Sequence, residues 1–182
     1  MNKATLNING LIGSDENEKG LELIDIVAAM RKQPSDIDAI ELIIGNTPGG
    51  FVDVGDDICR YLLSFKKPII SIVKEFCASI STKFFMIGDI RLMYPDAKLM
   101  IHNPWIGEVS GNADFLEERA ESLRMLEKDF VSLYSMKTGL DKEALSLLMK
   151  NEVEISAGEA VELGFATGLY KEQSNIAAYY KE

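Results

Sequence analysis

Two side chains in this sequence could together perform nucleophilic catalysis: Ser79 and the single histidine, His102. A serine hydroxyl is a weak nucleophile and needs a base within hydrogen-bonding distance, which an imidazole can supply. Ser79 follows an apolar strand-like run and precedes an apolar helix-like run, a setting that can lift a nucleophile above a sheet. Taken alone, each has a structural explanation, Ser79 as a helix N-cap and His102 as a satisfied structural side chain. Their joint presence is what raises the hypothesis of a Ser–His site.

A glycine-rich loop, Asn46–Gly50, follows an earlier apolar run. Sites in open α/β sheets gather at the carboxyl ends of strands, and glycines let backbone N–H groups approach a ligand oxygen. The helix predicted after Ser79 would offer further N–H groups to a developing oxyanion. The loop has neither the GxGxxG nor the GxxxxGK[ST] spacing, so the sequence does not predict a phosphate-binding loop. An ordinary strand–helix turn is the alternative.

Alternating strand and helix patterns surround these residues. Alternation and continuous apolar runs predict strands over Thr5–Ile12, Ala39–Ile44, Ile69–Val73, Ile90–Tyr94 and Lys98–Asn103. Helical spacing predicts helices over Leu21–Lys32, Val52–Ser64, a run ending near Ile87, Asp114–Thr138, Lys142–Lys150 and a short one opened by a capping box at Ser156. This βαβ order predicts one α/β domain with a mostly parallel sheet. We expect the long helix to be an interface element, and the segment after Tyr170 to fray or to dock on a partner.

Composition and charge exclude several classes of function. The 182 residues include 19 basic and 29 acidic side chains, a net charge of −10, which disfavours binding to nucleic acid or to an anionic membrane surface. No run approaches ~18 apolar residues, and no signal peptide is recognisable. One histidine cannot form a multi-histidine metal site, and Cys59 and Cys77 fit no zinc or redox motif. Carboxylate-only calcium or magnesium sites stay open, although no EF-hand loop is present. We expect a cytoplasmic protein with buried, reduced cysteines.

Three segments, in order, resemble the family of the Clp protease proteolytic subunit, ClpP: Asn46–Gly50, Ala78–Ser79 and Leu99–Pro104. The spacing from Ser79 to His102 and the sequence Met-Ile-His-Asn-Pro-Trp look most similar to the phage and prophage ClpP-like head maturation proteases. Two later segments, Lys137–Gly139 and Ser156–Gly164, are also similar. The resemblance covers roughly residues 5 to 168.

The resemblance implies a fold and an activity. The fold would be a ClpP/crotonase-like βαβ superhelix in one domain over residues 1–182, with a projecting handle helix at about 113–138. The activity would be that of a serine endopeptidase, which cleaves polypeptides through an acyl-enzyme inside a homo-oligomeric ring. An ATP-dependent unfoldase is a possible partner, and no cofactor is implied.

The resemblance also implies roles for individual residues. Ser79 would be the nucleophile and His102 the base, while the backbone N–H groups of Gly49 and Ile80 would form the oxyanion hole. Six residues would bind an extended peptide by strand addition: Gly50, Phe51, Val52, Trp105, Ile106 and Gly107.

The third member of the triad is expected to be an acid just before Ser156. Glu152 is preferred over Asn151, because a carboxylate stabilises an imidazolium better than an amide does. Glu154 and Asp96 are weaker candidates.

Two departures from the family pattern leave alternatives open. The family usually has glycine four residues before the nucleophile and two residues after it, where this chain has Glu75 and Ser81. Glu75 could narrow the turn at the nucleophile or change how substrate approaches. One alternative is therefore a catalytically weak or inactive assembly protein on the ClpP fold. Another is a crotonase-type acyl-CoA enzyme, which shares the oxyanion chemistry but does not need Ser79 paired with His102.

Overall fold

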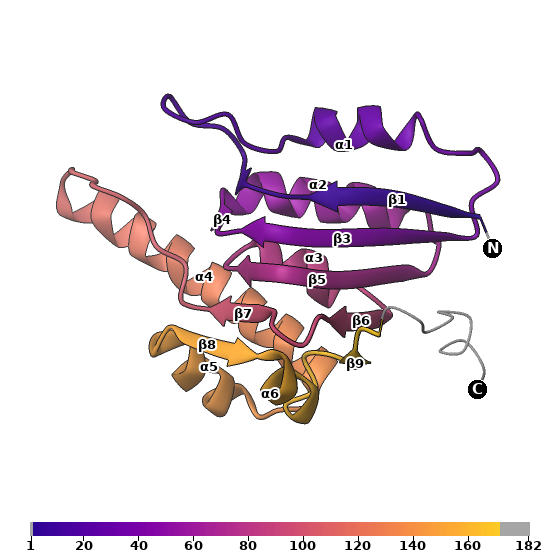
Figure 1. Cartoon of the computed structure of the whole chain (residues 1–182). Helices are drawn as coiled ribbons and strands as arrows, with labels where there is room; N and C mark the ends of the chain where they lie inside the picture. Colours follow the sequence, from indigo (N-terminus) through magenta and orange to yellow (C-terminus); the bar gives the residue numbers. More distant parts are fainter. Residues whose placement is uncertain (1, 172–182) are drawn as a thin grey trace.

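The apolar runs form a mostly parallel sheet in the computed structural model, which describes residues 2–171 (Figure 1). Within that range seven strands make one sheet. Five of them are parallel and lie side by side in the order β1 (Lys3–Ile8), β3 (Ala39–Thr47), β5 (Ile69–Ala78), β6 (Ile90–Met93) and β9 (Gly168–Leu169). The second half of β5 pairs with β7 (Lys98–Ile101), and β8 (Val153–Ser156) lies antiparallel to β7. The central strands β3 and β5 are buried along most of their length.

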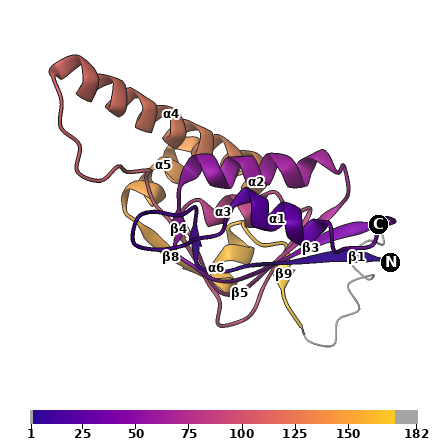
Figure 2. The ribbon, with the colours of Figure 1, turned by 90° about the horizontal axis from the view of Figure 1, so that it is seen from above.

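The helices cover one face of this sheet and its β7–β8 end. The first three are α1 (Leu23–Met30), α2 (Val52–Ser64) and α3 (Ser81–Met86), which lie on the same face (Figure 2). They are followed by α4 (Ala113–Thr138), α5 (Lys142–Lys150) and α6 (Ala157–Glu162). The core lies between the first three helices and the sheet, and it includes fully buried Phe84, Phe85 and Ile58.

Helix α4 projects beyond the sheet (Figure 1). Its buried side chains, Phe130, Val131 and Tyr134, all lie in its C-terminal half, where the Tyr134 hydroxyl bonds the Thr82 hydroxyl at 2.6 Å. Asn112 caps the N-terminus and Gly139, at φ 77°, ends the helix. The N-terminal half therefore has few partners within the described chain.

Several predicted strands differ from the observed ones. Strand β1 stops at Ile8, and Leu11–Ile12 forms a separate strand, β2, that pairs with β4 (Gly49–Gly50) in a small second sheet. Strand β5 runs to Ala78 instead of Val73 because it changes partner from β6 to β7 at Lys74 and Glu75. Strand β3 runs to Thr47 instead of Ile44, and strands β4, β8 and β9 were not predicted. The last three have two to four residues each. They are short and depend on partners distant in the sequence, so local patterns carry little signal for them.

Some smaller findings complete the description. Helix α1 begins at Leu23 because Glu22 forms a capping box with Asp25. No helix within residues 2–171 is long and apolar enough to cross a membrane. The expectation for the segment after Tyr170 concerns mainly residues 172–182, which lie outside the described part of the chain.

Candidate active site

Ser79 occupies a strained turn between β5 and α3. Its φ of 56° lies in the left-handed region, which non-glycine residues seldom adopt, at a cost on the order of 1–3 kcal/mol. Hydrogen bonds fix its backbone at both the N–H and the carbonyl. The N–H donates to the Met100 carbonyl at 3.0 Å. The carbonyl accepts from the Thr82 N–H at 3.0 Å and from the Thr82 hydroxyl at 2.6 Å. The surrounding structure thus holds a strained serine at the end of a buried strand, as a nucleophile requires.

The glycine-rich loop lies directly against this serine. A Cβ atom at Gly49 would stand 2.5 Å from Ser79 Cβ and 3.2 Å from Ser79 Oγ. Gly49 also has a φ of 105°, so both its conformation and the space around it require glycine. The loop is fixed by the pairing of β4 with β2 and by the Phe51 N–H, which donates to the Ile12 carbonyl at 2.8 Å. The backbone of Gly49 therefore reaches the side of Ser79.

His102 stands on the neighbouring strand, just after β7. Strands β5 and β7 are parallel, and Ala78 of β5 pairs with Met100 of β7. Ser79 and His102 therefore both follow the carboxyl ends of adjacent strands. Burial lowers the pKa of His102 below its ordinary value of 6.5, while the charge of Glu152 opposes this shift. The imidazole is therefore neutral near pH 7, the form that can accept a proton. No hydrogen bond joins the two side chains in this structure, although both line one cleft; such contacts often tighten only when substrate binds.

Glu152 lies across the strand pair from His102. Ile101 pairs with Val153 in the antiparallel β7–β8 register, so the next residues outward are His102 and Glu152. Glu152 has a φ of 51°, and its N–H donates to the Met149 carbonyl at 3.1 Å. The residues that follow Glu152, Val153–Ser156, form strand β8.

The other candidates for the third position have different surroundings. Glu154 binds the Lys98 ammonium at 2.8 Å, and Asn151 caps the C-terminus of α5. Asp96 lies in the turn that precedes β7. Within residues 2–171, Glu152 is the charged group whose field acts on the pKa of His102.

A cleft of about 1180 Å³ contains Ser79, His102 and Gly49 together. It is also lined by all six residues predicted to bind substrate: Gly50, Phe51, Val52, Trp105, Ile106 and Gly107. Trp105 is 72% exposed although it is a large apolar residue. The predicted nucleophile, base and peptide-binding residues are thus brought to one place. Ile80 is fully buried behind the cleft, beside Ser79 in the chain.

One wall of this cleft was not predicted from the sequence. Leu123, Leu126 and Phe130 of α4 line it. Their helical spacing was a visible signal, but it predicted only an interface element. The N-terminal part of α2 adds charged lining through Asp53 and Asp56.

The two departures from the family pattern have structural explanations. Glu75 is exposed on β5 where that strand changes partner, and it does not line the cleft, so it does not narrow the turn at Ser79. Ser81 is fully buried, and its hydroxyl bonds the Thr47 hydroxyl at 2.7 Å. A serine is therefore accommodated where the family usually has glycine.

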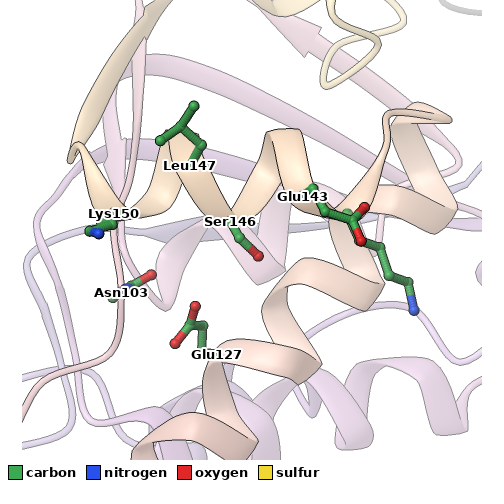
Figure 3. A pocket seen from close by; sticks show the side chains of 7 residues that line it. Asn103, Glu127, Glu143, Ser146, Leu147 and Lys150 are labelled. Carbon is green, nitrogen blue, oxygen red and sulfur yellow. The ribbon is translucent and has the colours of Figure 1, made fainter.

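A second, smaller cavity of about 390 Å³ lies between α4 and α5. Figure 3 shows the side chains of Asn103, Glu127 and Ser146 pointing toward it. The side-chain oxygen of Asn103 is buried there without a hydrogen-bond partner in the described chain. Lys150 also lines this cavity, so acidic and basic groups are balanced around it.

The sequence is similar to those of known proteins. The sequence profile of the Clp protease family matches residues 16–173. The ATP-dependent Clp protease proteolytic subunit 1 of Chlamydia trachomatis serovar D is 28% identical over 127 residues, which cover 68% of this chain and 66% of that protein. The ATP-dependent Clp protease proteolytic subunit 1 of Protochlamydia amoebophila is 27% identical over 126 residues, which cover 68% of this chain and 61% of that protein. The ATP-dependent Clp protease proteolytic subunit of Borrelia garinii subsp. bavariensis is 29% identical over 124 residues, which cover 65% of this chain and 62% of that protein. The chain thus matches just under two thirds of the length of these relatives.

Proposed function

The chain belongs to the Clp protease family, and from this premise we propose that it is a serine endopeptidase that works through an acyl-enzyme. One observation carries the proposal. Ser79 is held in a left-handed turn with the backbone of Gly49 against its side chain, in the same cleft as His102. A strained serine beside a glycine backbone and a neutral imidazole is the arrangement that acyl transfer needs.

In the proposed reaction, Ser79 Oγ attacks the carbonyl carbon of the scissile peptide bond, and its proton passes to the His102 ring. The carbonyl oxygen becomes negatively charged, and the N–H groups of Gly49 and Ile80 stabilise that charge. The C–N bond then breaks, and His102 gives its proton to the leaving amine. A water molecule attacks the acyl-enzyme, again losing a proton to His102, which returns it to Ser79 as the carboxylate product leaves.

Glu152 is the proposed third member of the triad. The protonated His102 formed in the first step is stabilised by a nearby carboxylate, and the charge of Glu152 already acts on this imidazole. Glu152 is exposed, so solvent screens part of this effect. We therefore assign it a supporting role that is smaller than that of a buried acid.

The substrate in this proposal is an extended polypeptide. Its backbone would add as a strand beside Gly49–Gly50 and the segment Trp105–Gly107. One of its side chains would enter the cleft between α2 and α4, where Leu126 and Phe130 offer apolar surface.

Assembly into a ring is part of the same proposal. The projecting half of α4 exposes apolar side chains, including Leu116 and Met125, that a neighbouring copy could cover. The names of the relatives describe them as ATP-dependent proteolytic subunits, which supports an ATP-driven unfoldase as the partner. The sequence around His102 supports a closer relation to phage and prophage head maturation proteases, and we place the particle in the cytoplasm.

The proposal is tested with a fluorophosphonate probe, which reacts only with activated serines, followed by intact-mass spectrometry. We expect one adduct per chain, and none in Ser79→Ala. An adduct that persists in Ser79→Ala would contradict the assignment of the nucleophile. A well-folded protein that forms no adduct would contradict the proposed activity and favour an inactive assembly protein on the same fold.

A further inference from the structure

A partly buried ion pair, with Asp56 at the edge of the cleft, lies one helical turn from the nucleophile. Lys83 Nζ on α3 binds Asp56 Oδ1 on α2 at 2.6 Å, and the Lys83 side chain is only 11% exposed. The same ammonium stands 4.5 Å from the centre of the Phe130 ring of α4. Replacing a buried ion pair with apolar side chains is often neutral or stabilising, so fold stability alone explains this one poorly.

Each of the two helices joined by this pair follows one of the two proposed oxyanion donors in the chain. Helix α2 starts at Val52, immediately after the loop that contains Gly49, and α3 starts directly after Ile80. Any movement of α2 against α3 would therefore change the separation of the Gly49 and Ile80 N–H groups.

Close contacts already bring these segments together near the nucleophile. A Cβ at Gly49 would meet Ser79, and a Cβ at Gly55 would stand 2.3 Å from Ile80 Cγ1. The Thr47 and Ser81 hydroxyls are 2.7 Å apart. These contacts prevent the segments from approaching further, but only the Thr47–Ser81 bond among them resists separation.

The Asp56–Lys83 pair supplies an attractive contact further along the interface between α2 and α3, next to the Gly55–Ile80 contact. Asp56 follows Gly55 in the chain, and Lys83 lies three residues beyond Ile80. The Phe130 ring covers the ammonium from the side of α4, which limits its freedom to leave the carboxylate. A directional, charge-assisted bond thus sets one distance between α2 and α3.

We propose that Asp56 and Lys83 are a positioning pair that holds the Gly49 and Ile80 N–H groups at the separation needed to bind the oxyanion. The inference rests on the proposed function, because it assigns a role within that reaction. Oxyanion donors act only when they lie about 2.7–3.1 Å from the developing charge, so a small shift reduces transition-state stabilisation more than substrate binding.

The decisive variant is the double substitution Asp56→Asn with Lys83→Met. It removes both charges together, so no unpaired charge stays buried, and we expect its melting temperature to stay within a few degrees of the unmodified protein. Reaction of Ser79 with the fluorophosphonate is then followed over time. We expect the rate constant at saturating probe to fall by about tenfold or more, with the half-saturating concentration changed less than about threefold.

Two further variants provide controls. Asp57→Asn removes a carboxylate from the adjacent position of α2, where Asp57 forms an exposed pair with Arg60, and the rate should be unchanged. Lys83→Arg keeps the ion pair and the stacking on Phe130, and it should retain most of the rate.

The outcomes separate this inference from the proposed function. If the unmodified protein reacts at Ser79 and the folded double variant reacts equally fast, the positioning role is wrong and the proposed function stands. If the unmodified protein forms no adduct at Ser79, both are wrong. A slow double variant with a normal Lys83→Arg supports both.

Discussion

Replacing Gly49 with alanine tests the geometry around the nucleophile most directly. The new Cβ would stand 2.5 Å from Ser79 Cβ, whereas ordinary contacts begin at 3.4 Å, so the two must separate by about 0.9 Å. Misplacing a catalytic group by about 1 Å can reduce a rate by roughly a hundredfold. We therefore expect Gly49→Ala to slow phosphonylation of Ser79 by about that factor.

The same substitution should leave the protein folded. An alanine forced into the left-handed region at φ 105° costs about 1–2 kcal/mol, which is well below the ~5–15 kcal/mol by which domains are usually stable. The matched control is Gly158→Ala in α6, where a Cβ would meet nothing within 4 Å and no unusual φ is needed. It should react at the normal rate and be slightly more stable.

The assay measures the rate of adduct formation by intact mass, together with thermal unfolding of each variant. A folded Gly49→Ala protein that reacts as fast as Gly158→Ala would contradict this prediction, because it would show that the Gly49 backbone does not position Ser79.

Further predictions concern pH, assembly and the cysteines. Because burial lowers the pKa of His102 and the neutral imidazole is the base, the reaction rate should rise with pH through a value below 6.5 and then level off. Glu152→Gln removes the charge that raises this pKa, so it should move that limb of the pH–rate profile to lower pH and reduce the maximal rate; an unmoved limb would argue against Glu152. Met125→Glu, on the exposed half of α4, should yield smaller particles in light scattering, and unchanged particles would show that this face is not an assembly contact. Burial raises the pKa of the Cys59 thiol to about 12, so iodoacetamide should label it only after unfolding, which peptide mass spectrometry can check.

Local patterns predicted the parts of the site that depend on single strand ends. Ser79, His102 and the loop at Gly49 each follow a strand of the parallel sheet, and parallel strands place their carboxyl ends at one edge. The helices α2 and α5 have the predicted bounds, because their apolar spacing and their flanking residues define them locally.

Non-local pairing accounts for what the patterns did not predict. Strand β8 has four residues and exists because it pairs with β7, which places Glu152 across from His102. Strand β5 extends past Lys74 and Glu75, which interrupt its apolar run, because β7 continues the sheet where β6 ends. Such short or polar strands have weak intrinsic preference, so their partners decide them.

The class of fold, the order of the longer strands and helices, and the candidate nucleophile, base and glycine loop could all be predicted from the sequence, since these depend on residue type and local periodicity. The position of Glu152 across from His102, the wall of the cleft formed by Leu123, Leu126 and Phe130, and the contact of Asp56 with Lys83 emerge only in the folded chain. Periodicity shows which face of a helix is apolar, but not what that face meets. Contacts between residues far apart in the chain form only when the whole sheet and its helices assemble.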